Sequence, residues 1–201
     1  MKKLLPILTA CLMLLSSFIA HPAAGGYQVG DKAADFKLKN VDGKMVSLAD
    51  NKATKGYIVV FTCNTCPYAK AYESRIVELN KKYASQGFPV VAINPNDPSV
   101  APGDSYAAMQ TKKYAFPYLL DETQQVAKTY GATRTPHLYV LVRKGNDLVV
   151  AYIGAIDDNS EDATAVKTKY VENAMTEIIG GKPATTSSTK AIGCTIKWKR
   201  A

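Results

Sequence analysis

Apolar residues along this 201-residue chain recur with two different periods, and the change of period predicts where strands and helices lie. Residues 57–61 (YIVVF) and 89–94 (PVVAIN) are short, continuous apolar runs, which is typical of strands buried on both faces. Between them, residues 67–86 place apolar side chains three and four positions apart. We therefore predict an amphipathic helix there that ends at Gly87.

The sequence before residue 57 and after residue 94 also predicts strands and helices. Residues 30–49 predict two short strands joined by an Asp-Gly turn, and residues 137–153 predict a β-hairpin around a Lys-Gly-Asn-Asp turn. We expect further elements as follows: strands at 117–120, 137–142 and 148–153, and helices at 104–114 (capped by Asp104), 122–130 and 161–179. This order predicts an α/β fold with a central mixed sheet flanked by helices, an N-terminal β extension and a C-terminal tail.

The first residues have the layout of a secretory signal peptide. Lys2 and Lys3 precede an apolar run, and small residues follow it. A membrane anchor is one alternative, although the run is short for a span. Lipidation is another, because Leu-Thr-Ala-Cys11 resembles a bacterial lipobox. We predict an exported, periplasmic protein without a stable membrane span after cleavage, organised as a signal peptide at 1–24, one domain at 27–180, and a polar tether with a tail at 181–201.

Charge and composition narrow the range of partners. Cleavage after residue 24 removes two lysines and no acid, which lowers the formal net charge from +8 to +6. The remaining lysines are scattered rather than gathered in a stripe, so we predict no nucleic-acid site. An acidic cluster at residues 157–162 has the wrong spacing for an EF-hand loop, and capping of the last helix explains it.

Three cysteines remain after cleavage, Cys63, Cys66 and Cys194. The first two form a Cys-x-x-Cys motif at a strand-to-helix junction, where the unpaired N–H groups of the helix stabilise a thiolate. We predict that Cys63 lies at an exposed mouth and attacks with a lowered pKa, and that Cys66 resolves the mixed disulfide. An inert disulfide and half of a zinc site are the alternatives. The chain has no second close pair of ligands, so we predict neither a metal nor a cofactor.

The stretch FTCNTCPYAKAY, together with ATRTPHLYVL, resembles the thioredoxin superfamily. The stretches GDKAADFKLKNVDGK and FPYLLDETQQVAKTYGA narrow the resemblance to the AhpC/TSA (redoxin) branch, in a peroxiredoxin-like subgroup with a CxxC motif. The resemblance implies a thioredoxin-like fold, a cis peptide bond between Thr135 and Pro136, and docking of a substrate backbone beside them. It also implies protein thiols or disulfides as substrates and a redox partner of unknown identity.

The sequence departs from a true peroxiredoxin in one important respect. That family places a Thr or Ser three residues before its peroxide-reactive cysteine and a Pro seven residues before it. Neither residue is present for Cys63 or for Cys66. We therefore predict an enzyme, an exported thiol–disulfide oxidoreductase that acts through a Cys63–Cys66 dithiol and disulfide. A thiol peroxidase and a non-catalytic thioredoxin-fold binding protein are the alternatives.

Three further residues are candidates for accessory roles. Cys194 lies in a hydrophobic, strand-like tail motif, and the polar tether is long enough to return it to the domain as a third redox thiol. Arg134 is a cation that can stabilise a nearby thiolate if it faces the cleft. His137 follows Pro136, and either packs as an ordinary buried or exposed histidine or transfers protons.

Overall fold

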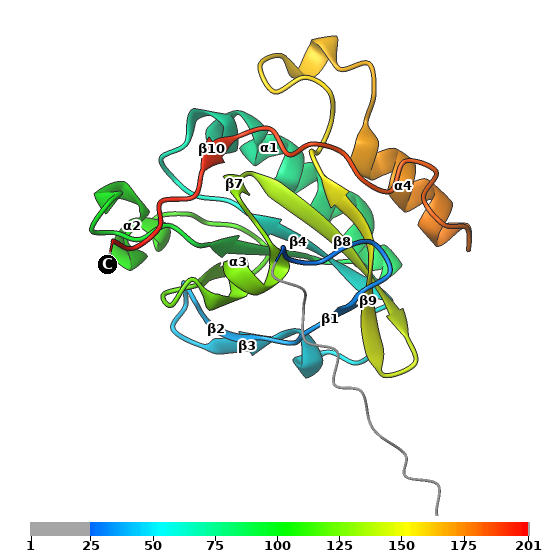
Figure 1. The fold of residues 1–201 in the computed structure, drawn as a ribbon, viewed down its shortest axis with the longest axis horizontal. Coiled ribbons are helices and arrows are strands. Elements are labelled where there is room, and N and C mark those ends of the chain that lie inside the picture. Colours follow the sequence, from blue (N-terminus) through cyan, green and yellow to red (C-terminus); the bar gives the residue numbers. More distant parts are fainter. Residues whose placement is uncertain (1–24, 201) are drawn as a thin grey trace, which may run out of the picture.

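The computed structural model describes residues 25–200, and they form one eight-stranded mixed sheet with helices on both faces (Figure 1). The strand order is β1 (Lys32–Ala33), β9 (Asp147–Gly154), β8 (His137–Lys144), β4 (Gly56–Phe61), β5 (Val90–Asn94), β6 (Tyr118–Leu120), β2 (Lys37–Asn40) and β3 (Met45–Ser47). Strands β4 and β5 lie parallel at its centre, and all their residues are buried. Burial on both faces explains why each reads as a continuous apolar run.

The other strands extend the sheet on both sides of this pair. On one side, β8 (His137–Lys144) runs antiparallel to β4 and forms a hairpin with β9 (Asp147–Gly154), as predicted. On the other side, β6 (Tyr118–Leu120) pairs with β5. The N-terminal extension supplies the two edges with β1 (Lys32–Ala33), β2 (Lys37–Asn40) and β3 (Met45–Ser47).

Alternate residues of β4 belong to two separate hydrophobic clusters, one on each face of the sheet. Ile58 and Val60 pack in a cluster with side chains of α1 (Pro67–Tyr83) and α4 (Tyr170–Ile179). Tyr57, Val59 and Phe61 belong to a second cluster that includes residues of α3 (Gln125–Tyr130). Because successive side chains of a strand point to opposite faces, the central strand holds both layers to the same scaffold.

Two predicted helices are much shorter than expected. The helix expected at 104–114 is α2 (Tyr106–Met109), and its N-cap is Ser105 rather than Asp104. The helix expected at 161–179 begins only at Tyr170. In the segment before it, Asn159 accepts the backbone N–H groups of Glu161 and Asp162, and such local side-chain bonds compete with helix formation.

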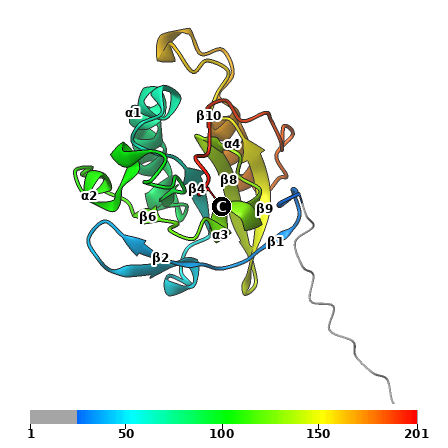
Figure 2. The ribbon, with the colours of Figure 1, turned by 60° about the vertical axis from the view of Figure 1, so that its left-hand side comes forward.

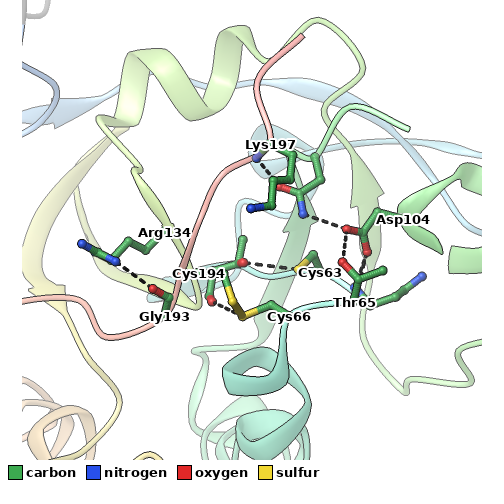
Figure 3. The surroundings of a disulfide bond; sticks show 11 residues. Cys63, Thr65, Cys66, Asp104, Arg134, Gly193, Cys194 and Lys197 are labelled. Atoms are coloured by element: carbon green, nitrogen blue, oxygen red, sulfur yellow. Dashed lines mark hydrogen bonds between the residues drawn. A yellow bond between two sulfur atoms is a disulfide. The ribbon is translucent and has the colours of Figure 1, made fainter. Parts of the chain in front are cut away.

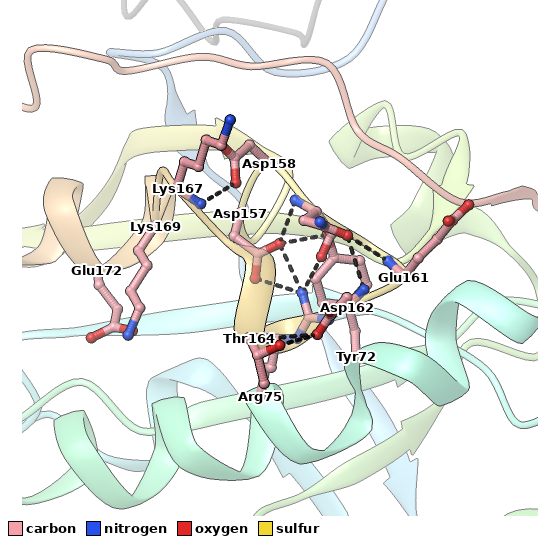
Figure 4. Close-up of polar contacts among 11 residues, drawn as sticks. Tyr72, Arg75, Asp157, Asp158, Glu161, Asp162, Thr164, Lys167, Lys169 and Glu172 are labelled. Carbon is pink, nitrogen blue, oxygen red and sulfur yellow. Dashed lines mark hydrogen bonds and ion pairs between the residues drawn. The ribbon is translucent and has the colours of Figure 1, made fainter.

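The loop after β9 is tied to α1 by a buried ion pair (Figure 4). The Nη1 group of Arg75 donates to both carboxylate oxygens of Asp157, at 2.8 and 2.7 Å. Tyr72, one turn earlier on α1, donates its hydroxyl to the same carboxylate at 2.9 Å. The expectation that the acidic cluster caps the last helix is therefore wrong, because the N-cap of α4 is Lys169, and Asp157 instead anchors the loop after β9 to α1.

The polar tether lies against the domain rather than away from it. Ser188 forms a parallel bridge with Ile153 of β9, and the chain then crosses to the N-terminal end of α1 (Figures 1 and 2). There β10 (Cys194–Thr195) pairs antiparallel with β7 (Arg134–Thr135). This pairing brings the tail motif to the candidate active site.

The predicted signal peptide and the alternative lipid site at Cys11 lie outside the described residues. Among residues 25–200, no helix has the length and apolar character needed to span a membrane.

Candidate active site

The Cys63-Asn-Thr-Cys66 motif lies between the end of β4 and the start of α1, as the sequence predicts. Cys66 is the N-cap residue of the helix, and Pro67 occupies the first turn, where a missing N–H group costs nothing. Both cysteine side chains are buried, with exposures of 6% for Cys63 and 4% for Cys66. The expectation that Cys63 lies at an exposed mouth is wrong for this structure, because the C-terminal tail crosses the site (Figure 3).

Thr135 and Pro136 lie directly against this motif. The peptide bond between them is cis, as the resemblance implied. The hydroxyl oxygen of Thr135 is 3.2 Å from the sulfur of Cys63, and its carbonyl oxygen is 3.1 Å from the sulfur of Cys66. One buried residue beside the proline therefore contacts both sulfurs of the motif.

A disulfide joins Cys66 to Cys194, and Cys63 is a free thiol. The predicted Cys63–Cys66 disulfide is therefore not the pair present in this structure. Pairing of Cys194 with Thr135 across β10 and β7 brings the tail cysteine to the helix start, with a Cα–Cα distance of 5.9 Å to Cys66. That separation lies in the range a disulfide requires. The suggestion that Cys194 is a third thiol for this pair thus has a structural basis.

The pKa of the Cys63 thiol is raised, opposite to the expected direction. Burial is the main cause, because removal from water penalises the thiolate. The Thr135 hydroxyl opposes this by stabilising the thiolate, the Asp104 carboxylate adds to the increase, and the backbone N–H groups of Cys66 and Thr65 lower the pKa. The stabilising groups at the helix start are present as predicted, but burial outweighs them.

Asp104 is a site residue that the sequence analysis assigned to helix capping. It is fully buried, and its Oδ1 atom accepts the backbone N–H groups of Asn64 and Thr65 at 2.7 and 3.0 Å. Its Oδ2 atom accepts the Thr65 hydroxyl and the Asn96 side-chain amide, each at 2.7 Å. Three of these bonds fix the two residues between the cysteines, and the fourth joins Asp104 to Asn96. The sequence carried no signal for this role, because the contact spans 40 positions.

The two accessory candidates beside the proline contact other groups than the sulfurs. Arg134 donates from Nη1 to the carbonyl oxygen of Gly193 at 2.8 Å, so it anchors the tail rather than a thiolate. His137 accepts the Thr133 N–H at Nδ1 and packs on Tyr139. Burial, and to a smaller extent the Arg134 charge, lowers the pKa of His137 to about 4, so the imidazole is neutral near pH 7.

Within residues 25–200, no cluster of three or more His, Cys, Asp or Glu side chains has the arrangement needed to hold a metal ion. The reactive groups of this site are three sulfur atoms, one hydroxyl and the surrounding main chain. Such a set can carry out thiol–disulfide exchange, in which a thiolate attacks one sulfur of a disulfide and displaces the other.

Comparison with known proteins agrees with this chemistry. Residues 29–152 match the AhpC/TSA family. The chain belongs to this family. The match confirms the predicted redoxin branch, and thioredoxin-like structures among the neighbours confirm the fold. The family match and the thiol-disulfide oxidoreductases among the relatives confirm the prediction that the chain is an oxidoreductase of this superfamily.

Three similar proteins illustrate the range of the family. A crystal structure described as an uncharacterized conserved protein from Geobacillus kaustophilus is 37% identical, with a TM-score of 0.79, covering 87% of this chain and 94% of its own. The thiol-disulfide oxidoreductase ResA of Bacillus cereus is 24% identical over 67% of this chain and 79% of its own. A putative thiol:disulfide interchange protein DsbE from Chlorobium tepidum is 27% identical, with a TM-score of 0.50, over 61% and 84%.

Proposed function

We propose that this protein is an exported thiol–disulfide oxidoreductase in which Cys63 is the attacking thiol and Cys66 the resolving thiol. One observation carries the proposal: both sulfurs lie at the start of a helix, within 3.2 Å of Thr135 beside the cis proline. The family match and the names of the relatives support the reaction class. Export rests on the sequence of residues 1–24, and protein disulfides in that compartment are the proposed substrates.

The proposed reaction consists of two exchange steps. The Cys63 thiolate attacks one sulfur of a substrate disulfide, and the other substrate sulfur leaves with the electron pair and takes up a proton. The Cys66 thiolate then attacks the sulfur of Cys63, which forms the Cys63–Cys66 bond and releases the second substrate thiol. Two electrons pass from the enzyme dithiol to the substrate, and the reverse sequence oxidises a substrate dithiol.

Local groups support these roles. The hydroxyl of Thr135 and the N–H group of Cys66 stabilise the thiolate that forms at Cys63, and the N–H group of Thr65, which also donates to Asp104, makes a smaller contribution. Asp104 holds Asn64 and Thr65 in place, which keeps these donors in position. The carbonyl oxygen of Thr135 is an acceptor for the Cys66 thiol when that residue is reduced.

A trapping experiment tests the proposal. The Cys66→Ser/Cys194→Ser chain is reduced, desalted and treated with glutathione disulfide, and the modified residue is mapped by mass spectrometry. We expect one glutathione to accumulate on Cys63, because no neighbouring thiol resolves it. In the wild-type chain we expect it to be released as an internal disulfide forms.

Two controls define the alternatives. The Cys63→Ser/Cys194→Ser chain leaves only the resolving thiol of the motif and should trap far less glutathione. If neither double variant reacts, and the wild-type disulfide resists dithiothreitol, the cysteines form an inert staple. The chain is then the non-catalytic binding protein.

A thiol peroxidase is the second candidate, and the Cys66–Cys194 disulfide is the observation that favours it. In that reaction the Cys66 thiolate attacks hydrogen peroxide, water leaves, and the Cys194 thiol condenses with the resulting sulfenic acid to form the disulfide and a second water. Stopped-flow peroxide consumption separates the two candidates. Rapid consumption that survives Cys63→Ser supports the peroxidase and contradicts the role of Cys63 as the attacking thiol.

A further inference from the structure

The C-terminal tail occupies the place at which a substrate backbone is expected to dock. Strand β10 pairs antiparallel with β7, with Cys194 opposite Thr135 and Thr195 opposite Arg134. The same strand carries the cysteine that is bonded to Cys66 (Figure 3). The tail is thus arranged as an extended peptide joined by a mixed disulfide to one cysteine of the motif.

The contacts that hold the tail are directed mainly to its backbone. The carbonyl oxygen of Lys197 accepts the Asp97 N–H and the Gln124 side-chain amide, both at 2.9 Å. The N–H of Lys197 donates to Asn96 Oδ1 at 2.9 Å, and the N–H of Lys199 donates to Gln124 Oε1 at 2.8 Å. Main-chain bonds of this kind give affinity for any extended polypeptide.

Two of these contacting side chains are amides that are themselves buried. Asn96 is 3% exposed, and so is Gln124. A buried amide that lost its partner would leave unsatisfied donors and acceptors, which is unfavourable. We call the surface formed by Asn96, Asp97, Gln124 and β7 the tail groove. Its polar groups are matched to a peptide backbone rather than to a small molecule.

Two side-chain positions of the tail add selectivity. A Cβ atom on Gly193 would lie 2.2 Å from the carbonyl oxygen of Thr135, so only glycine fits before the cysteine in this arrangement. Ile196 is 2% exposed and packs in the cluster of Phe61 and Tyr130, whereas Thr195 and Lys197 on either side of it are exposed. The groove therefore fits a pattern of glycine, cysteine, any residue and an aliphatic residue.

We propose that residues 193–199 are a tethered substrate of this site, and that the tail groove binds external substrates as extended polypeptides with the pattern Gly-Cys-x-aliphatic. The inference rests on the proposed function for its chemistry. It goes beyond that function in naming the groove residues, the peptide pattern and the internal competitor.

The tether makes one internal exchange possible. The Cys63 thiolate attacks the sulfur of Cys66, the Cys63–Cys66 bond forms, and the Cys66–Cys194 bond breaks. The electron pair leaves with Cys194, which takes up the proton that Cys63 lost. One disulfide is present before and after, so no external oxidant or reductant is consumed. The closed form has Cys63 free, and the open form has Cys194 free and the groove vacated.

The identity of the free thiol in the oxidised chain measures this equilibrium. The chain is quenched in acid, unfolded, alkylated and mapped by mass spectrometry for label on Cys63 or on Cys194. In the wild-type chain we expect label mainly on Cys63. The Gly193→Ala variant forces a methyl group against the Thr135 carbonyl, so we expect the ratio of open to closed form to rise by about tenfold or more.

Matched variants control for general damage. Thr195→Ala alters the exposed neighbour of the cysteine and should leave the ratio within about twofold of wild type. Gln124→Asn shortens the side-chain amide that holds the tail, and asparagine tolerates the positive φ at this position. We expect this variant to raise the ratio of open to closed form. The matched control Gln125→Asn, on the exposed side of α3, should leave the ratio unchanged. The single tryptophan, Trp198, gives an independent fluorescence signal of tail release. Equal ratios in wild type and Gly193→Ala would overturn the inference.

External peptides test the substrate pattern directly. The oxidised Gly193→Ala chain is mixed with the peptide AIGCTIKWK. Its thiolate attacks the Cys66 sulfur, as Cys194 does in the tail, so the peptide–Cys66 bond forms, the Cys63–Cys66 bond breaks, and Cys63 leaves with the electron pair and takes up a proton. We expect peptides in which Ala replaces the Gly or the second Ile to form at least about tenfold less adduct than a peptide in which Ala replaces the Thr. Equal adduct from all of them would contradict the pattern.

The two proposals fail in different ways. Glutathione trapping at Cys63 uses a chain in which no disulfide holds the tail, and it does not require the peptide pattern. A chain that traps glutathione but shows no response to Gly193→Ala refutes the tethered substrate alone. A chain that fails to trap glutathione refutes the proposed function.

Discussion

Two regions of α1 each hold a distant segment of the chain through buried groups. At its N-terminal end, Cys66 is bonded to Cys194 of the tail, and the tail backbone is held by amide side chains. In its middle, Tyr72 and Arg75 hold Asp157 of the loop after β9. The Cys66–Cys194 disulfide can be exchanged by the neighbouring Cys63 thiol, whereas the ion pair and hydrogen bonds of Asp157 involve no covalent bond that a thiol can exchange.

The difference teaches how one helix serves both stability and reaction. Asp157 accepts from a charged donor and from a hydroxyl, so removing Arg75 would leave a buried carboxylate without its opposite charge. At the other end, Asp104 orders the loop between the cysteines but bonds neither sulfur. We therefore expect substitutions in the middle of α1 to change stability alone, and those near its start to change sulfur reactivity as well.

The largest expected effect is that of Asp157→Ala. It leaves the Arg75 guanidinium buried without its carboxylate, and we expect it to lower the free energy of unfolding by about 3 kcal/mol, measured by urea denaturation. The rate of Cys63 alkylation in the folded chain should not change. Glu161→Ala, an exposed acid of the same loop, is the control and should stay within about 0.5 kcal/mol of wild type. If Asp157→Ala changed the rate of Cys63 alkylation, the middle of α1 would affect reactivity as well as stability, which contradicts the comparison.

A similar effect is expected from acidification, through His137 beside the active site. Its pKa is lowered to about 4 in the folded chain from an ordinary value of 6.5, so the unfolded chain binds the proton first as the pH falls. The resulting stability is present above pH 6.5 and is lost as the pH falls towards 4, by about 3 kcal/mol. His137 is the one histidine beyond residue 24, so its imidazole resonance can be titrated directly by NMR.

The comparison variant is His137→Gln, which does not titrate. Its free energy of unfolding should fall less than that of wild type between pH 7 and pH 4, since other groups titrate equally in both chains. An imidazole resonance that titrates near 6.5 in the folded protein would remove the basis for this prediction.

Asp104→Asn should lower stability by an intermediate amount and should raise the reactivity of the Cys63 thiol. An asparagine keeps one acceptor for the loop N–H groups but presents its own amide to Thr65 and Asn96, so we expect a loss of about 2 kcal/mol. It also removes a negative charge that raises the pKa of Cys63, so alkylation at pH 7 should become faster. Glu122→Gln, an exposed acid, is the control for both measurements. Slower alkylation in the Asp104 variant would show that loop order matters more than charge.

The sequence predicted the parts of the molecule that depend on short-range patterns. The continuous apolar runs of β4 and β5 and the periodic face of α1 were recognisable, because burial on one or two faces leaves a repeating pattern. The position of Cys63 and Cys66 before α1 followed from these elements. The lengths of α2 and α4 were overestimated, and for α4 the reason is that bonds from the backbone to the Asn159 side chain compete with helix formation before Tyr170.

The contacts that the tail and Asp104 make at the active site could not be predicted from the sequence. Cys194 lies 128 residues from Cys66, and the bonds that bring it there are made largely by main-chain groups, which leave no pattern of residue types. Asp104 was assigned to a helix cap because aspartate is common there, whereas its partners lie in the loop after β4. The raised pKa of Cys63 follows mainly from its burial among segments that are distant in the sequence, so it could not be expected from the motif alone.

The smallest expected effect is that of Thr135→Val, which separates the role of the hydroxyl from that of the fold. Valine has the same shape but gives the Cys63 thiolate no donor, so the pKa of Cys63 should rise further and the thiolate fraction at pH 7 should fall. One lost hydrogen bond of about 1 kcal/mol corresponds to alkylation by iodoacetamide that is about fivefold slower. Thr133→Val, at an exposed side chain two residues earlier, should react at the wild-type rate. If both variants alkylate at that rate, Thr135 acts at this site only through its backbone, and the thiolate is stabilised by the N–H groups at the helix start.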